Sequence, residues 1–373
     1  MFLHDIGVYL INLLSGLAIS EVAIKQKEMG CETPTSYKDF TNTCFNKEIG
    51  SIVSALFIFM NYCIVAFDTT RCGEILNERI FSEIGASQIS GGFSAITAIL
   101  IATFSSKSIS RISAILTTFM FITFGTILIP GLALMQDPIT TMSARALGDP
   151  VNGSLISLSS VAPIFLTAMI YQNIVPTVVK ILSYNRKASV VAVTVGSTIP
   201  ALMFFAYILA SCGGGVTAIN PSIITTFAIS SLSGSGLAAS LSLEEEFRSI
   251  IKEVFLKETD KMCNIDGIPS LRNVKEDEPE STAVTIAAIL LATFPPLAVG
   301  ILYSHGSTFI DALRWAGTYG SPIVYGILPA TLAFKLRQEE PSVVVPDLLP
   351  FGNFPLLLLA ASALSFSVVC AVS

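Results

Sequence analysis

The stretch SSVAPIFLTAMIYQNIVPTVVKILSY, residues 159–184, decides how the rest of the chain is interpreted. It is long and apolar enough to cross a bilayer, which takes about 20 apolar residues. Tyr171-Gln172-Asn173 interrupts its middle, and Pro176 then removes a helix hydrogen bond. Non-helical backbone at membrane depth survives only where protein or a watery cavity satisfies it, so the break predicts a substrate site. An ordinary kinked helix with a buried amide pair is the alternative.

Composition places the whole chain in a membrane. Hydrophobic residues make up 52% of it and charged residues 13%, about half the usual charged share of a soluble domain. Long apolar runs separate the charges, which predicts an all-α, polytopic membrane protein with a single transmembrane domain over residues 1–373. The cations form short clusters without a basic groove, which argues against a nucleic-acid partner. The seven cysteines show no CxxC pair, and no cofactor or metal is expected.

The distribution of Lys and Arg supports a count of ten spans. Loops on one side of the expected topology hold 17 of the 21 cations, whereas the opposite loops hold only Arg79 and Arg145. The positive-inside rule places the first set in the cytoplasm or an equivalent compartment; which membrane it is stays open. The N-terminus then lies outside, and we expect a further span before residue 1. The expected spans are 5–24, 49–70, 90–105, 112–135, 159–182, 188–211, 222–243, 282–304, 307–335 and 350–372.

The largest inner segment is 244–281. Its first part has apolar residues on one helical stripe, which predicts an amphipathic helix lying at the membrane interface. An acidic run, Glu276-Asp277-Glu278-Pro279-Glu280, follows it and predicts a solvated loop.

Signatures of enzymes are sparse in this chain. It has only His4 and His305, and it contains no HExxH, GxSxG, Walker A or dinucleotide-binding pattern. A membrane-embedded enzyme therefore has no catalytic constellation behind it.

Polar residues inside the spans are the better functional candidates. Asn61 and Tyr62 lie in the middle of a span and are expected to face the break, with an interhelical hydrogen bond as the alternative. The Ser/Gly-rich span offers hydroxyl ligands, although such residues usually allow close helix packing. Its candidates are Ser230, Ser231 and Ser233.

Two carboxylates are candidates for coupling transport to an ion. An ionisable group in the membrane is a functional candidate by default, and Glu21 and Asp68 both lie in or near spans. Pairing of Glu21 with Lys25, four residues later, is the alternative for the first. An ion cluster with Arg71 and Glu74 at the outer end is the alternative for the second.

Several motifs together resemble the aromatic amino acid permeases, which are specific for tryptophan or tyrosine. Their sixth helix has the pattern Pro-x-Phe-x-Thr, then a polar interruption and a final Ile/Val-Pro. Here that pattern is matched by Pro163, Phe165, Thr167, Tyr171-Gln172-Asn173 and Val175-Pro176. Other stretches resemble the second, eighth and tenth helices: Ala18–Val22, Leu241-Ser242-Leu243, Ala316–Gly320 and Gly326–Pro329.

The resemblance implies the amino acid–polyamine–cation superfamily, with a leucine-transporter-like fold of 5+5 inverted repeats. The ten spans would then be helices two to eleven, with helix one absent. It further implies a secondary active transporter of an aromatic amino acid, coupled to protons, with alternating access around residues 168–176. The expected substrate-binding residues are Thr167, Tyr171, Gln172, Asn173, Asn61, Tyr62, Ser230, Ser231 and Ser233. A truncated or non-transporting membrane scaffold or receptor that retains the permease fold is the alternative.

Overall fold

The computed structural model describes residues 2–31, 34–133, 170–212, 221–265, 282–302, 313, 315–339 and 347–372. The regular elements in these ranges are all helical, which confirms the predicted all-α class. In chain order they are α1 (Phe2–Glu28), α2 (Tyr37–Cys44), α3 (Lys47–Arg79), α4 (Ala86–Thr103), α5 (Ser106–Ala133), η1 (Gln172–Ile174), α8 (Val175–Ile181), α9 (Arg186–Cys212), α10 (Pro221–Ile265), α11 (Thr282–Leu302), η3 (Ala316–Gly320), η4 (Ile323–Ile327), α13 (Leu328–Glu339) and α14 (Phe354–Val372).

Seven helices in the described part of the chain are long and apolar enough to cross a membrane. They are segments of α1, α3, α4, α5, α9, α10 and α11, and each coincides with an expected span. The apolar part of α14 is shorter, and residues 159–169 of the expected span 159–182 lie outside the described residues. Most of the expected span 307–335 is described, and it is divided among η3, η4 and α13. The chain is therefore a multi-pass integral membrane protein, as predicted.

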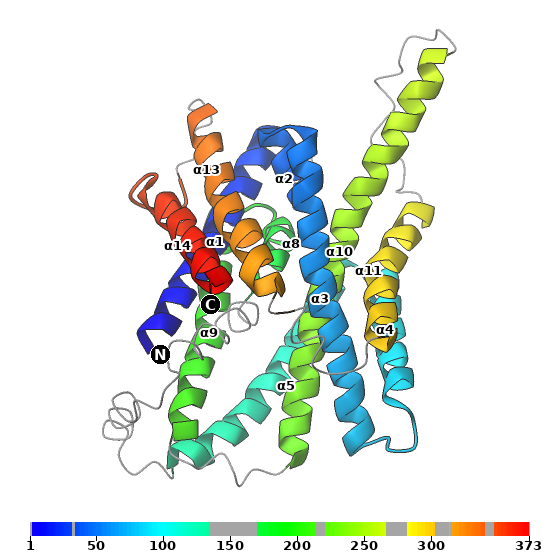
Figure 1. The fold of residues 1–373 in the computed structure, drawn as a ribbon, viewed down its shortest axis with the longest axis vertical. Helices are drawn as coiled ribbons and strands as arrows, with labels where there is room; N and C mark the ends of the chain where they lie inside the picture. The colour runs from blue at the N-terminus through cyan, green and yellow to red at the C-terminus, as the bar shows by residue number, and fades with distance from the viewer. Residues whose placement is uncertain are drawn as a thin grey trace.

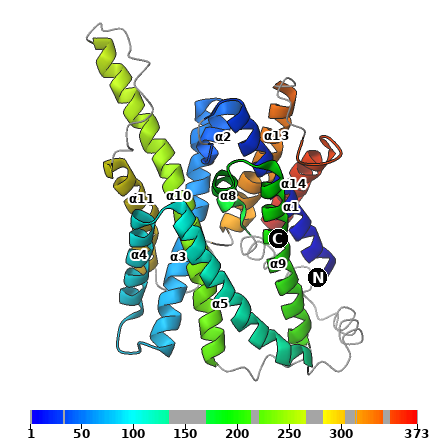
Figure 2. The same ribbon diagram turned by 180° about the vertical axis from the view of Figure 1, so that it is seen from behind.

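The helices form two groups that meet at the middle of the molecule. In the first, α1 packs against α8, α9, α13 and α14; in the second, α3 packs against α4, α10 and α11. Figure 1 shows the first group on the left and the second on the right, with α5 crossing below between α9 and α10. Seen from behind, α8 lies between the groups (Figure 2).

In the polar segment between α1 and α3, side chains cap the N-termini of α2 and α3. The Ser36 hydroxyl accepts a hydrogen bond from the Asp39 N–H at 2.9 Å, which starts α2. The Asn46 side chain accepts one from the Ile49 N–H at 3.1 Å and starts α3. The short helix α2 is thereby held against α3, on the side that the charge count assigns to the cytoplasm.

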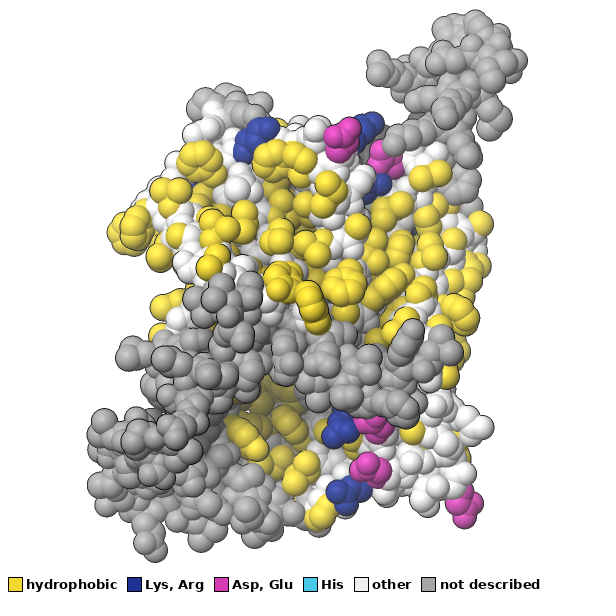
Figure 3. Space-filling model, viewed as in Figure 1, with side chains coloured by type: hydrophobic (Ala, Val, Ile, Leu, Met, Phe, Trp, Pro, Cys, Tyr) yellow, Lys and Arg dark blue, Asp and Glu magenta, His cyan; other side chains and the backbone are white. Residues whose placement is uncertain are grey.

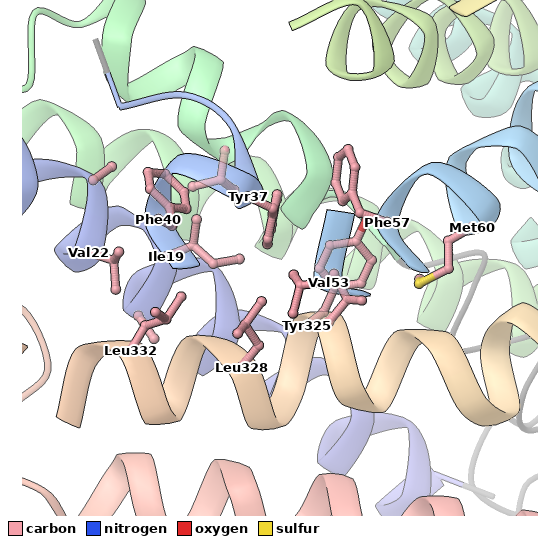
Figure 4. Packing of buried hydrophobic residues seen from close by; sticks show 14 of the residues in the cluster. Ile19, Val22, Tyr37, Phe40, Val53, Phe57, Met60, Tyr325, Leu328 and Leu332 are labelled. Atoms are coloured by element: carbon pink, nitrogen blue, oxygen red, sulfur yellow. The ribbon is translucent and has the colours of Figure 1, made fainter. Parts of the chain in front are cut away.

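A hydrophobic core joins the inner ends of both groups. It combines side chains of α1, α2, α3, η4 and α13 (Figure 4). The Tyr37 ring stacks on Phe57 with centroids 4.6 Å apart, and Tyr325 meets Tyr37 edge-on at 5.9 Å. The buried rings of Tyr37, Phe57 and Tyr325 fill the space on the inner side of the helix break, the side that the charge count assigns to the cytoplasm.

The surface agrees with a membrane setting. On the face drawn in Figure 3, hydrophobic side chains form a broad band, with charged side chains gathered above and below it. Large apolar side chains such as Ile52, Leu202 and Phe294 are more than 60% exposed, as expected of side chains that face lipid.

The helix α10 is longer than the sequence predicts. It runs without interruption over 45 residues, so the segment beginning at 244 continues the same helix rather than forming a separate one. The reason is local: between Leu237 and Ile265 the chain has no glycine or proline to end the helix. The acidic run at 276–280 lies outside the described residues.

Candidate functional site

The described residues contain the break that the sequence predicts. Tyr171 is not helical, η1 makes a single tight turn over Gln172–Ile174, and α8 then begins at Val175. Pro176 lies in the first turn of α8, where its missing N–H costs no helical hydrogen bond. The proline therefore starts a short helix instead of kinking a long one.

One side of the break is held by α1. The Tyr171 hydroxyl donates to the Asn12 carbonyl oxygen at 3.0 Å, and Gln172 Nε2 donates to Asn12 Oδ1 at 2.6 Å. Gly16 lies one turn further along α1, and a Cβ built there would come within 2.6 Å of the Tyr171 hydroxyl. Asn12 and Gly16 thus form the surface of α1 against which the Tyr171 side chain packs. Glycine at position 16 leaves the room that the Tyr171 hydroxyl occupies.

The other side of the break is held by the second group of helices. Asn173 Nδ2 donates to Asn61 Oδ1 on α3 at 3.1 Å, and the Ser242 hydroxyl on α10 donates to the Asn173 carbonyl oxygen at 3.0 Å. From α2, the Tyr37 hydroxyl donates to the Gln172 carbonyl oxygen at 3.2 Å. Burial raises the pKa of Tyr37 well above its ordinary value, so this phenol stays protonated and remains a donor.

A cavity of about 420 Å³ lies beside the break, between α3 and α10. That volume falls in the range of small-molecule sites, which are mostly apolar with a few polar groups. Its apolar lining includes Ile64, Phe67, Ile170, Ile174, Leu232 and Ala238. Its polar lining is Asp68, Tyr171, Asn173, Ser231 and Ser235.

Asp68 is the carboxyl group of this cavity. It is 4% exposed, its Oδ2 has no hydrogen-bond partner, and the Ser235 hydroxyl lies within hydrogen-bonding reach of the carboxyl. Arg71 pairs instead with Glu74, at 2.7 Å, so these two form the expected ion pair without Asp68. No Lys or Arg is among the described residues that line the cavity.

The other candidates lie around the cavity rather than in its lining. The Tyr62 hydroxyl donates to the Leu291 carbonyl oxygen on α11 at 2.6 Å. Asn61 and Gln172 are fully buried and engaged with the break. Ser230 is buried, and Ser233 lies within hydrogen-bonding reach of the Cys72 thiol. Thr167 lies outside the described residues.

Glu21 belongs to a buried ion cluster at the inner end of α1. It is 1% exposed, and Arg337 donates to both of its oxygens, at 2.7 Å each. Lys25 lies 3.2 Å from Glu21 and 2.9 Å from Asp347. The pairing of Glu21 with Lys25 is the alternative that the sequence offered to a coupling role for Glu21. The cluster joins α1, α13 and the segment before α14.

Two further carboxylates connect α10 to the inner side of the break. Glu245 accepts a hydrogen bond from Thr177 at 2.5 Å and lies 3.6 Å from Lys180, both on α8. Glu246 accepts bonds from the Tyr37 and Lys38 N–H groups at the start of α2, at 2.9 and 3.2 Å. These contacts fix α8 and α2 relative to α10.

Sequence reasoning missed Asn12 and Gly16 as parts of this site, whereas Ser235 lies in the Ser/Gly-rich span that was predicted to offer hydroxyl ligands. Asn12 is an amide within an apolar span and was detectable on the same grounds as Asn61. Gly16 carries no such signal, because small residues are common where membrane helices pack closely.

Non-helical backbone at residues 170–171, held between two helix groups and beside a cavity, is the pattern expected of a transporter's substrate site. The family model of the tryptophan/tyrosine permease family matches residues 2–220 and 215–370, and the chain belongs to that family. It is a permease of amino acids and not an enzyme. The chain is also 25% identical over 365 residues to tyrosine-specific transport system 1 of Haemophilus influenzae; the match covers 94% of this chain and 85% of that protein.

Proposed function

We propose that this permease carries aromatic amino acids, tyrosine or tryptophan, across the membrane together with a proton. The observation that carries the proposal is the cavity at the helix break, which combines an apolar wall with one buried carboxyl. The Haemophilus influenzae relative, a tyrosine-specific transport system, supports the same substrate class.

The break supplies the polar half of the site. Unwound backbone around Tyr171 offers peptide groups to the carboxylate and ammonium of an amino acid. The Asn173 side chain lines the same cavity and is fixed by Asn61, so it is oriented before the substrate arrives. Gln172 has a positioning role, because its side chain is fully buried against Asn12. Thr167 and Ser231 remain proposed contacts.

The apolar wall supplies the rest of the site. Ile64 and Phe67 on α3 face Leu232 and Ala238 on α10 across the cavity. An aromatic ring that packs against these side chains is removed from water, which favours its binding.

Of the two coupling candidates, Asp68 is the better placed. Its carboxyl has one oxygen without a partner in the cavity, whereas Glu21 is neutralised by Arg337 and Lys25. The titratable groups around Asp68 are Cys72 on the same helix and Tyr171 across the cavity. A proton taken up by Asp68 on one side and released on the other would couple transport to the proton gradient.

Alternating access then follows from the two helix groups. The hydrogen bonds across their boundary converge on residues 172–180, through Asn61, Ser242, Tyr37 and Glu245. Rocking of one group against the other would exchange these bonds and open the cavity to either side.

The test is uptake of labelled tyrosine and tryptophan into proteoliposomes that contain the full chain, with and without an inward proton gradient. Uptake driven by the gradient and abolished in the double variant Tyr171→Ala, Asn173→Ala supports the proposal. Ser51→Ala, at an exposed site on the inner end of α3, is the matched control. A scaffold or receptor would show neither uptake nor a thermal shift with any aromatic amino acid.

A further inference from the structure

The cavity has an unusual combination of lining groups. Away from the break its lining is apolar except for Asp68, Ser231 and Ser235, and Asp68 is almost wholly buried and keeps one oxygen without a hydrogen-bond partner. A buried acceptor in that state costs free energy unless a donor reaches it. The described lining residues supply no cation, and an occupant of the cavity that carries a donor would satisfy this oxygen.

The position of Asp68 along α3 indicates which part of the occupant reaches it. Asn61, which holds Asn173 at the break, precedes Asp68 by seven residues on the same helix. Seven residues of α-helix span about 10 Å. Asp68 therefore lies about two helical turns along α3 from the residue that holds the break, a separation comparable to the length of an extended aromatic amino acid.

The space between the break and Asp68 is lined by Ile64, Phe67 and Leu232. A substrate whose ammonium and carboxylate groups are held at the break would lay its ring along these side chains. The tip of its ring would then point at the free oxygen of Asp68, beside Ser235.

We propose that Asp68, supported by Ser235, accepts a hydrogen bond from the substrate's ring, so that the cavity takes phenol and indole side chains in preference to a plain phenyl ring. This rests on the proposed function and adds the chemical criterion by which substrates are selected. A phenyl ring leaves the acceptor buried and unpaired, whereas a phenol O–H or an indole N–H satisfies it.

The criterion is compatible with a proton on Asp68. A protonated carboxyl group still has a carbonyl oxygen that accepts a hydrogen bond. Selection of the ring therefore does not depend on the protonation state that coupling requires.

The first experiment needs no variant. Binding of labelled tyrosine to the purified full chain is competed with tyrosine, phenylalanine and O-methyltyrosine, and binding of tryptophan with 1-methyltryptophan. We expect each analogue without a donor to bind about tenfold to hundredfold more weakly. Phenylalanine is smaller than tyrosine and O-methyltyrosine is larger, so a loss shared by both follows the donor and not the size.

The second experiment uses Asp68→Leu and Asp68→Asn. Leucine removes the acceptor, and we expect the preference for tyrosine over phenylalanine to disappear while phenylalanine still binds. Asparagine keeps a carbonyl acceptor, and we expect much of the preference to remain. The control is Thr70→Val, which changes a buried residue of α3 outside the cavity lining.

The outcomes separate the two proposals. Equal binding of tyrosine, phenylalanine and O-methyltyrosine to the unmodified protein, or an unchanged preference in a folded Asp68→Leu variant, overturns the ring criterion alone. Failure of every aromatic amino acid to bind the unmodified protein overturns the proposed function itself.

Discussion

Asn173 in the helix break donates its amide hydrogen to Oδ1 of Asn61 in the middle of α3, at 3.1 Å. Asn61 in turn donates to the Phe57 carbonyl oxygen at 2.9 Å, which fixes which way its amide points. These two hydrogen bonds therefore fix the position of the break relative to α3, the helix that also carries Asp68.

Replacing Asn61 by leucine should leave Asn173 without its partner. The cost of an unsatisfied buried amide is about 1–3 kcal/mol, so we expect a lower melting temperature and weaker substrate binding. Tyrosine affinity and thermal melting of the purified variant measure both effects. Unchanged affinity in a folded variant would show that Asn61 does not orient the site.

Gly16→Ala should displace Tyr171. The new methyl group would lie 2.6 Å from the Tyr171 hydroxyl, a distance at which the ring has to move. We expect reduced uptake, partly restored by adding Tyr171→Phe, which removes the hydroxyl. Gly7→Ala is the matched control, because nothing lies within 4 Å of a Cβ at that position. Equal uptake by the Gly16→Ala and Gly7→Ala variants would show that the packing of Tyr171 against Gly16 is not needed for transport.

Asp68→Asn should abolish the pH dependence of transport. In the unmodified protein, uptake should rise as the external pH falls, because the proton enters with the substrate. An amide at position 68 does not take up or release a proton as the pH changes, so exchange of labelled for unlabelled tyrosine should continue while accumulation against a gradient stops. Uptake and exchange at acidic and alkaline pH measure this. Persistence of proton-driven accumulation would exclude Asp68 as the coupling group.

Glu21→Gln should destabilise the protein without removing the pH dependence. The change leaves the buried guanidinium of Arg337 partly uncompensated, which costs about 3–5 kcal/mol in comparable buried pairs. The double variant Glu21→Gln, Arg337→Met should recover much of the melting temperature. Loss of proton coupling in the folded protein would instead assign that role to Glu21.

Tyr37→Phe should weaken the inner side of the break. It removes the hydrogen bond to the Gln172 carbonyl oxygen but keeps the stack on Phe57, so folding should be preserved. In an Asn173→Cys background, we expect faster labelling by a thiol reagent applied from the cytoplasmic side. Identical labelling rates with Tyr and Phe at position 37 would argue against a role in closing that side.

Much of the architecture was predictable because it depends on hydropathy and charge. Apolar runs and alternating cations located the spans that the described helices confirm, and Pro176 with its polar neighbours located the break. The length of α10 was not predicted, because an amphipathic stripe fits an interfacial helix as well as a continued span.

The partners of the site were less predictable than its position. Tyr171, Asn173, Ser231 and Asp68 all line the cavity, but the sequence could not separate them from Tyr62, which turns toward α11. Which face of a helix meets which neighbour depends on packing between segments far apart in the chain. For Gly16, the requirement is visible only once Tyr171 is in place.

The uninterrupted course of α10 also makes it a lever. Its 45 residues span about 68 Å, more than twice the hydrocarbon thickness of a bilayer. Figure 1 shows its C-terminal end projecting beyond the other helices. Because the same rigid rod lines the cavity through Ser231 and Ser235, a small tilt there is magnified at the distant end. A fluorophore attached near Ile265 would therefore report movements at the cavity that are too small to detect locally.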